Sequence, residues 1–496
     1  MFTRVLIANR GEIAVRVARA CREMGIEAVA VYSDADARAP HVALADRAVR
    51  IGPAAPAQSY LSIDAILAAA RQTGAEAIHP GYGFLSENPE FARACEQAGV
   101  VFIGPPAAAI DRMGSKIAAR RLAEQAGVPL VPGATPASQD DAAIAEAARR
   151  IGVPVLLKPS EGGGGIGMKV VRDEASLLSA IAQARREAVA AFGDGTLYVE
   201  RLVERPRHVE IQVLADHHGN IVHLFERECS IQRRHQKVIE ETPSVALTPA
   251  LRARMGDAAV AVARAAAYRN AGTVEFLLEG SGDAARFYFL EMNTRLQVEH
   301  PVTEQVTGVD LVRAQIAVAR GERLPWTQSQ LSQRGHAIEL RVYAEDPLRH
   351  DLPQAGPLLL YREPVMPGIR IDSGVIEGGE VTVHYDPMVA KLIATGETRE
   401  AARRRAIVAL RQFPILGIRT NTALLLALLE HPRFVSGDLD TGFLDTEGER
   451  IRASLDSDAP PEVLAVAEAV QATPGDESFA VDEPSDPWTT LRGWRG

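Results

Sequence analysis

This sequence has few cysteines, no long apolar run and no excess of basic over acidic residues. Each of these features excludes some classes of protein. The three cysteines, Cys21, Cys95 and Cys229, show no paired spacing, so neither a disulfide framework nor a zinc site is indicated. No apolar run approaches the roughly 20 residues that a membrane-spanning helix needs, and residues 1–12 lack the apolar core of a secretory signal. The net charge of -10 argues against binding to nucleic acid or to an anionic membrane. We therefore expect a cytoplasmic enzyme that binds neither nucleic acid nor membrane.

The glycine motifs of common nucleotide-binding folds are also missing. The first strand-to-helix turn reads Asn9-Arg10-Gly11 instead of G-x-G-x-x-G, and the glycine run at 162–165 lacks the G-K-[ST] ending and the helix of a P-loop. Apolar strands at residues 4–8 and 27–32 nevertheless flank an amphipathic helix at 12–24, and similar units follow to residue 104. This alternation predicts a parallel sheet covered by helices. A length of 496 residues suggests about three domains.

A glycine-rich segment separates two predicted strands, at residues 153–158 and 168–171. Consecutive glycines let backbone N–H groups approach phosphates closely and allow a loop to move. Hairpin turns without a function use glycine equally often, so the loop alone does not establish a phosphate site. Further antiparallel strands are predicted at residues 197–203, 208–214, 221–227, 273–278 and 286–291.

Residues 287–299 read FYFLEMNTRLQVE and alternate between two kinds of side chain. In an extended chain every second side chain points to the same face. If the whole stretch is one strand, a single face carries Glu291, Asn293, Arg295, Gln297 and Glu299, while the other face is mostly apolar. A polar edge strand with a salt bridge is the alternative interpretation. We favour a site that holds a metal cation and an anion side by side.

Two carboxylates flank the hairpin predicted around residues 279–285, and their placement suggests a metal site. Glu275 precedes the turn and Glu291 follows it, and facing carboxylates repel each other unless a cation lies between them. With Asn293 the donor set is all oxygen, which suits Mg²⁺ or Mn²⁺ better than zinc. Lys116, Lys158 and the glycine loop would supply the rest of a site for a nucleoside triphosphate.

A polar and basic stretch at residues 227–241, RECSIQRRHQKVIEE, lies between turn and strand signals. A charge run of this kind is usually a solvated surface. Here Gln232 and His235 are interleaved with Arg233, Arg234 and Lys237, which fits contacts to a ribose and to anions better. The acidic background argues against a nucleic-acid patch.

Several longer stretches resemble the biotin carboxylase component of biotin-dependent carboxylases, which are ATP-grasp ligases. They are residues 7–14 (IANRGEIA), 79–87 (HPGYGFLSE), Lys158 with its glycine run, 207–212 (RHVEIQ), 232–241, 291–300, and Arg341 with 345–347. These stretches are spread over about residues 1–446. Residues 384–388 (HYDPM) are most similar to the α subunits of acyl-CoA carboxylases.

The resemblance implies a role for each matching residue. The phosphates would be held by Lys116, Lys158 and the glycine lid with Gly163, Gly164 and Gly165. The adenine would lie near Glu200 and Leu202, and the ribose and phosphates near His208, Gln232 and His235. The metal would be bound by Glu275, Glu291 and Asn293. Bicarbonate would be held by Arg295, Gln297 and Val298, with Lys237 touching both phosphate and bicarbonate. Glu299 would be the general base, and Arg341 would stabilise the enolate of biotin.

The resemblance also implies an α/β fold with three domains and a tail. The expected parts are an N-terminal nucleotide-binding-like parallel-sheet domain (1–114), an ATP-grasp domain (115–331) with a mobile glycine-rich lid at about 132–203, a C-terminal mixed α/β domain (332–446) and an acidic, proline-containing tail (447–496). The implied cofactors are ATP and Mg²⁺ or Mn²⁺. The implied partners are a biotin carboxyl carrier protein, which would bring biotin as a substrate not attached to this chain, a carboxyltransferase subunit and a second copy of the chain in a homodimer.

Two positions in the lid depart from the family pattern. Glu161 stands where small residues are usual, and Ile166 stands where a basic residue is usual. An added carboxylate repels phosphates and a missing cation attracts them less, so these departures predict weaker nucleotide binding. Two alternatives remain open: another ATP-grasp carboxylate ligase of the amino-acid or purine type, and a weakly active nucleotide-binding subunit that serves assembly.

Overall fold

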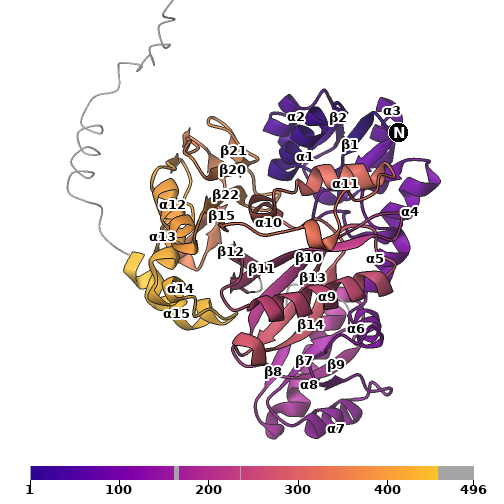
Figure 1. Cartoon of the computed structure of the whole chain (residues 1–496), viewed down its shortest axis with the longest axis vertical. Coiled ribbons are helices and arrows are strands. Elements are labelled where there is room, and N and C mark those ends of the chain that lie inside the picture. The colour runs from indigo at the N-terminus through magenta and orange to yellow at the C-terminus, as the bar shows by residue number, and fades with distance from the viewer. Residues whose placement is uncertain (1, 161–166, 235, 456–496) are drawn as a thin grey trace, which may run out of the picture. The chain divides into compact units, whose positions relative to one another are not determined.

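The computed structural model (Figure 1) describes residues 2–160, 167–234 and 236–455. Its first part is a parallel sheet with the strand order β3-β2-β1-β4-β5. The strands are β1 (Arg4–Ile7), β2 (Glu27–Ser33), β3 (Arg47–Gly52), β4 (Ala77–His79) and β5 (Val101–Phe102). The helices between them are α1 (Gly11–Glu23), α2 (Pro40–Leu44), α3 (Ile63–Thr73) and α4 (Pro89–Gln97). The predicted parallel sheet is confirmed. Strand β3 was not predicted, because Arg47 and Arg50 interrupt its apolar residues.

The largest sheet has the strand order β14-β13-β10-β11-β12-β15-β22-β20. Its strands are β10 (Arg207–Ala215), β11 (Ile221–Arg233), β12 (Gln236–Thr242), β13 (Asn270–Glu279), β14 (Arg286–Asn293), β15 (His336–Tyr343), β20 (Ile369–Ser373) and β22 (Met388–Gly396). The antiparallel hairpins β10–β11 and β13–β14 confirm the strands predicted there. Strand β12 pairs with β15, so the sheet continues past residue 331, where the sequence suggests a domain boundary. Helices α9 (Pro249–Ala265) and α10 (His300–Thr307) pack against this sheet.

A smaller antiparallel sheet carries the glycine-rich segment. It consists of β6 (Gly133–Ala134), β7 (Val155–Pro159), β8 (Lys169–Val171) and β9 (Leu197–Arg201), and helices α7 (Asp141–Ile151) and α8 (Leu177–Phe192) pack on it. Strands β7 and β8 pair antiparallel, which confirms the predicted strand–glycine–strand order. The predicted strand at 197–203 belongs to this sheet and not to the sheet of β10 and β11. Residues 161–166, with Glu161, Gly163, Gly164, Gly165 and Ile166, lie outside the described residues.

The prediction of one continuous strand over residues 287–299 is wrong. Strand β14 ends at Asn293, and helix α10 begins at His300. The pairing of β13 with β14 also shifts register, because Glu275 faces Glu291 while Phe276 faces Phe289. The extra residue, Leu290, is a bulge that changes which face the following side chains occupy. Phe287, Phe289 and Met292 therefore share one core, which a strict period of two would not allow.

The parallel sheet and the largest sheet share an apolar core. Through this core, helix α1 of the N-terminal part packs near strands β10 and β11 of the largest sheet. Ile13 and Val17 of α1 belong to the same buried cluster as Leu214 of β10 and Leu224 of β11. Helix α11 (Leu311–Ala319) contributes Leu311, Val312 and Ile316 to this cluster. Burial of apolar surface of this kind is the main stabilising contribution to such contacts.

The remaining elements are helices and short strands. The helices are α5 (Ala107–Gly114), α6 (Lys116–Gln125), α12 (Arg399–Arg411), α13 (Thr422–Glu430), α14 (Pro432–Ser436) and α15 (Phe443–Leu455). The short strands are β16 (Glu345–Asp346), β17 (Leu352–Pro353), β18 (Gly356–Pro357), β19 (Leu360–Tyr361), β21 (Glu380–Val381) and β23 (Ile415–Leu416). Helix α15 passes residue 447, where the sequence suggests that an acidic tail begins. Within the described ranges, no helix combines the length and the apolar character needed to cross a membrane.

Candidate active site

A cavity of about 1370 Å³ gathers most of the predicted site residues. The residues that line it include Lys116, Lys158, Glu200, Leu202, His208, Gln232, Lys237, Glu275, Glu291, Asn293, Arg295, Gln297, Val298 and Arg341. They come from the start of α6, from the small sheet, from the large sheet including β15, and from the loop before α10. Glu299 lies directly behind this lining, in contact with Lys237 and Arg341. His235 and the lid glycines lie outside the described residues.

The ammonium group of Lys237 joins three buried carboxylates. Its Nζ lies 2.6 Å from Glu210 Oε2, 2.9 Å from Glu275 Oε1 and 2.6 Å from Glu299 Oε1. Burial alone would lower the pKa of Lys237, but the three carboxylates outweigh burial and raise it well above its ordinary value. Lys237 therefore keeps its positive charge and holds the three acids together.

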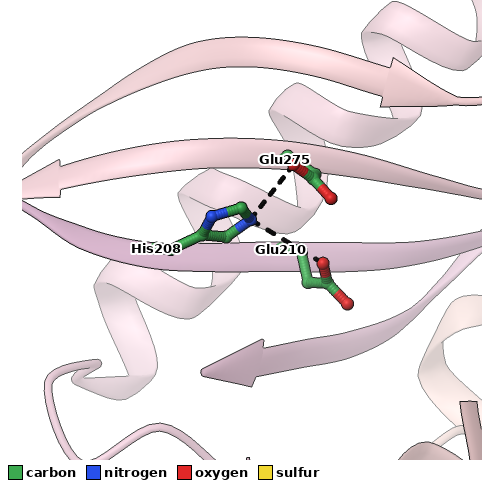
Figure 2. A group of neighbouring side chains, drawn as sticks. All are labelled: His208, Glu210 and Glu275. Atoms are coloured by element: carbon green, nitrogen blue, oxygen red, sulfur yellow. Dashed lines mark ion pairs between the residues drawn. The ribbon is translucent and has the colours of Figure 1, made fainter. Parts of the chain in front are cut away.

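His208 and Glu210 leave β10 on the same side as Glu275 of the neighbouring strand β13, as Figure 2 shows. The Nε2 atom of His208 is 3.1 Å from Glu275 Oε2 and 3.9 Å from Glu210 Oε2. Burial would lower the pKa of His208, but Glu275 raises it above its ordinary value. Glu210 was not among the predicted site residues. The two-residue spacing from His208 to Glu210 in a strand is the signal that could have identified it.

A fully buried arginine holds Glu210 in place. Arg227 donates from Nε to Glu210 Oε1 at 2.5 Å and from Nη1 to Gln212 Oε1 at 2.7 Å. Its remaining bonds go to Thr303 and Thr273, both at 3.0 Å. Sequence reasoning missed Arg227, because its partners come from two other strands and from α10.

Glu275 and Glu291 face each other across the β13–β14 hairpin, as predicted. Burial, and then Glu275, raise the pKa of Glu291, while Lys116 and Lys158 act in the opposite direction. Asn293 donates to Glu275 Oε1 at 2.9 Å, so its amide lies beside the pair. Two facing carboxylates with an adjacent amide oxygen fit a divalent cation such as Mg²⁺, which would relieve the repulsion between them.

Glu299 lies between two cations at the N-terminus of α10. Arg341 donates from Nη2 to Glu299 Oε2 at 2.9 Å, opposite the contact with Lys237. Burial would raise the pKa of Glu299, but Lys237, Arg341 and Arg227 hold it well below its ordinary range. Arg341 also donates from Nε to Glu240 Oε1 at 2.6 Å, and burial raises the pKa of Glu240 to about 7. Glu240 is a second acid that the sequence did not reveal.

Arg295 and Gln297 meet in the loop that follows β14. Arg295 Nη1 lies 2.8 Å from Gln297 Oε1, and its Nε lies 2.8 Å from Glu87 Oε2. The side-chain amide of Gln297 reaches Glu275 Oε1 at 3.4 Å. Glu87 and Glu275 therefore orient the guanidinium of Arg295 and the amide of Gln297. Both groups line the cavity, where a bound anion could accept hydrogen bonds from them.

On the side of the small sheet, Glu200 joins two basic groups. Lys158 Nζ lies 3.0 Å from Glu200 Oε2, and Arg120 of α6 contacts the other oxygen of the same carboxylate. Burial would lower the pKa of Lys158, but Glu200 raises it above its ordinary value. Lys158 is therefore cationic and lines the cavity. Leu202 follows β9 in the same wall.

The fold and these groups define an ATP-dependent ligase of the ATP-grasp class. Residues 115–327 match the family model of the carbamoyl-phosphate synthase L chain, ATP binding domain. Residues 1–110 match the biotin carboxylase N-terminal domain, and residues 339–446 match the biotin carboxylase C-terminal domain. The chain belongs to the biotin carboxylase family.

Individual relatives agree with this assignment. A biotin carboxylase of Halalkalibacterium halodurans is 52% identical over 444 residues, which are 90% of this chain and 97% of the relative. The mitochondrial methylcrotonoyl-CoA carboxylase subunit alpha of rat is 50% identical over 443 residues, but the match spans only 62% of its length. The biotin carboxylase domain dimer of Hydrogenobacter thermophilus 2-oxoglutarate carboxylase, solved with MgADP, ADP and bicarbonate, superposes with a TM-score of 0.87 at 44% identity. That match covers 93% of this chain and 100% of the solved chain.

Proposed function

We propose that this chain carboxylates biotin, using ATP and bicarbonate. The net reaction converts ATP, bicarbonate and biotin into ADP, phosphate and carboxybiotin. The observation that supports it best is the position of Lys237, within 2.9 Å of both Glu275 and Glu299. One cation thereby joins the carboxylates suited to a metal to the acid suited to proton transfer. A bound anion and a triphosphate could both reach it.

The nucleotide half of the site is assigned to the small sheet and the β13–β14 hairpin. Lys116 and Lys158 would neutralise phosphate oxygens, and Glu200 and Leu202 would lie near the adenine. His208 and Gln232 would lie near the ribose and phosphates. Glu275, Glu291 and Asn293 would hold Mg²⁺ or Mn²⁺. When bound, the metal supplies positive charge to the transferring phosphoryl group.

The bicarbonate half is assigned to Arg295, Gln297 and Val298. Val298 has an apolar side chain, so only its backbone N–H can donate to an anion. An oxygen of bicarbonate attacks the γ-phosphorus, the bond to ADP breaks, and carboxyphosphate is formed. Glu299 is ionised in this environment, so its carboxylate can accept the proton of bicarbonate. An anion beside Lys237 weakens the positive field at Glu299 and raises its affinity for that proton.

The second step transfers the carboxyl group from carboxyphosphate to a ring nitrogen of biotin and releases phosphate, which takes the proton that the nitrogen loses. Arg341 would stabilise the negative charge that develops on the oxygen of biotin, because its guanidinium lies in the cavity wall beside Glu299. Carboxyphosphate hydrolyses readily, so exclusion of water during the transfer matters.

The partners are proposed from the names of the relatives. The rat relative is a subunit of methylcrotonoyl-CoA carboxylase, and the solved relative is a dimer of biotin carboxylase domains. We propose that this chain receives biotin on a biotin carboxyl carrier protein and passes the carboxyl group to a carboxyltransferase subunit. In this scheme the chain forms a homodimer and serves an acyl-CoA carboxylase.

The test is incorporation of labelled bicarbonate into free biotin. The chain is incubated with ATP, Mg²⁺, labelled bicarbonate and biotin, and acid-labile label on biotin is counted against a reaction without ATP. ATP-dependent label supports the proposal. ATP hydrolysis without label on biotin would favour another ATP-grasp ligase. Absence of both activities in a folded protein that binds ATP would favour an assembly subunit.

A further inference from the structure

The loop from Thr294 to Glu299, here called the anion loop, is neither strand nor helix. Its shape therefore depends on contacts from other parts of the chain. At its start, Glu87 accepts from the backbone N–H of Thr294 at 2.9 Å and from Arg295 Nε at 2.8 Å. At its end, Glu299 contacts Lys237 and Arg341. Between these points the backbone of Val298 needs its own support.

That support comes from Lys391 on β22. Lys391 is fully buried, and its Nζ donates to the backbone oxygen of Val298 at 2.8 Å. The same Nζ lies 3.0 Å from Glu12 Oε1 and 3.7 Å from Asp372 Oδ2. A charge-assisted bond to this carbonyl fixes the peptide between Val298 and Glu299, which joins a proposed bicarbonate ligand to the proposed base.

Glu12 is itself held in place from two sides. It lies in the first turn of α1, is buried, and accepts a hydrogen bond from the hydroxyl of Tyr82. Gly374 packs on the same turn, because a Cβ there would lie 2.5 Å from the backbone nitrogen of Glu12. Helix α1 and β22 therefore meet at this ion pair, and the close packing of Gly374 leaves little space for the Glu12 backbone to move.

Lysine is rare in this chain, which makes its use at position 391 informative. Among 54 basic residues only five are lysines: Lys116, Lys158, Lys169, Lys237 and Lys391. Three of them line the cavity. Lys391 lies under the anion loop, where a compact ammonium can donate to a carbonyl and to carboxylates in different directions. An arginine has a larger, planar group that fits this arrangement poorly.

We propose that Lys391, anchored by Glu12, is a positioning residue for bicarbonate: it holds the Val298 carbonyl and so fixes the backbone between the Val298 N–H and the Glu299 side chain, so that this N–H and the Glu299 carboxylate face the anion. This inference rests on the proposed function of the cavity. It adds that the N-terminal part of the chain supports bicarbonate binding, through the contacts of Glu87 with Thr294 and Arg295 and through the contact of Glu12 with Lys391.

The test compares Michaelis constants in the biotin carboxylation assay. Lys391→Met removes the ammonium and keeps a buried chain of similar length. Lys391→Met combined with Glu12→Gln removes both charges of the ion pair, while Asp372 keeps its partner Arg370 at 2.7 Å. The expected result is a rise of roughly tenfold or more in the KM for bicarbonate, with the KM for ATP changed less than about twofold. Carboxylation of biotin by the wild-type protein in the same assay tests the proposed function independently of the Lys391 variants.

The control removes a buried ion pair between β11 and α9. Arg252 Nη2 lies 2.7 Å from Glu226 Oε1, and neither residue belongs to the anion loop or to the ion pairs of Lys391. Arg252→Met with Glu226→Gln should lower the melting temperature and leave the KM for bicarbonate unchanged. Three results would overturn the proposal: an unchanged KM for bicarbonate in the Lys391 variants, equal changes in both Michaelis constants, or failure of the doubly neutral variant to fold. Failure to fold would show that the Lys391–Glu12 ion pair contributes to stability and not to bicarbonate binding.

Discussion

At the scale of single residues, Glu299 combines a fixed position with a fixed charge. Lys237 and Arg341 contact its two oxygens at 2.6 and 2.9 Å, and it is fully buried. These cations keep the carboxylate ionised before bicarbonate enters. A substitution of Glu299 should therefore affect proton transfer more than nucleotide binding, because the side chain contacts Lys237 and Arg341.

Glu299→Gln should reduce the kcat of bicarbonate-dependent turnover by roughly 10²-fold or more, because an amide cannot take the proton. The KM for ATP should change less than about twofold, because Glu299 contacts Lys237 and Arg341, while the proposed nucleotide residues Lys158 and Glu200 pair with each other. Steady-state kinetics with ATP and bicarbonate varied separately will measure both effects. Near-normal turnover would remove Glu299 from the mechanism.

Glu291→Ala should abolish metal-dependent ATP hydrolysis, because Glu275 is already engaged by Lys237 and His208 and cannot hold the cation alone. The matched control is Glu279→Gln on the same hairpin, where the carboxylate pairs with Arg201 at 2.9 Å. The control should keep the Mg²⁺ dependence of the wild type. A Glu291→Ala protein with unchanged Mg²⁺ dependence would contradict the metal assignment.

At the scale of elements, the sequence predicted which residues meet but not how they meet. The period of two in residues 287–299 grouped Glu291, Asn293 and Arg295 correctly at the cavity. It could not show the bulge at Leu290 or the end of β14 at Asn293, because both depend on pairing with β13. The groups converge through hairpin register and a loop held by Glu87, not through one strand.

Contacts between distant elements were the least predictable part of the site. Glu210, Arg227 and Glu240 are strand residues whose partners lie on neighbouring strands or on α10. The residues next to them in the sequence do not indicate which side chains they contact, because the order of strands in a sheet depends on the packing of the whole chain. The predicted strands at 208–214 and 221–227 contained Glu210 and Arg227 and left their roles open, whereas no strand was predicted at Glu240, which lies in β12.

Glu241 on β12 illustrates how such a contact between elements affects stability. It accepts from Arg399 of α12 at 2.6 and 2.9 Å and lies 2.7 Å from His336 Nε2 of β15. Burial would raise the pKa of Glu241, but His336 and Arg399 outweigh it and hold the pKa at about 2. A folded-state pKa below the unfolded value stabilises the protein above the unfolded pKa, and this stability is lost as the pH falls toward 2.

Glu241→Gln should therefore lower the stability most at neutral pH, by about 3 kcal/mol for a pKa depressed by about two and a half units. The melting temperatures of the variant and the wild type should converge as the pH falls from about 4.5 toward 3. Glu400→Gln on α12 is the control, since that carboxylate is 44% exposed in its pairs with Arg403 and Arg404 and solvent screens it. A constant gap between wild type and Glu241→Gln at every pH would contradict the prediction.

At the scale of the whole molecule, the parallel sheet and the glycine hairpin could be predicted from local patterns, because short apolar strands and capped helices leave clear signals. The continuation of one sheet from β12 into β15 could not, because it joins segments almost a hundred residues apart. This shared sheet places Arg341 and Lys391 beside the anion loop. The site is therefore assembled from the small sheet, the large sheet and the anion loop, and Glu87, in the turn before α4, holds the start of that loop.

The lysines of this chain are poor sites for covalent attachment of biotin. Biotin is attached to proteins through a lysine side chain, and this chain has only five lysines. Lys116, Lys158 and Lys237 line the cavity, and Lys391 is fully buried. Lys169 follows Met168 in a sequence superficially similar to a biotin site, yet it begins β8, pairs with Leu157 of β7, and its Nζ lies 2.8 Å from Glu187 of α8. A lysine held in a sheet and an ion pair is a poor substrate for a ligase that modifies exposed turns.

The chain produced together with a biotin ligase should therefore carry no biotin, while a biotinylated carrier added separately should accept label from bicarbonate. Intact-mass spectrometry measures the first outcome, and acid-labile label on the carrier measures the second. The matched control is Lys169→Arg, which keeps the ion pair with Glu187 and removes the one lysine in a similar sequence setting; its mass spectrum should show the same lack of biotin. A biotin adduct that disappears in Lys169→Arg would show that this strand opens to the ligase, and the carboxyl acceptor could then be the chain itself.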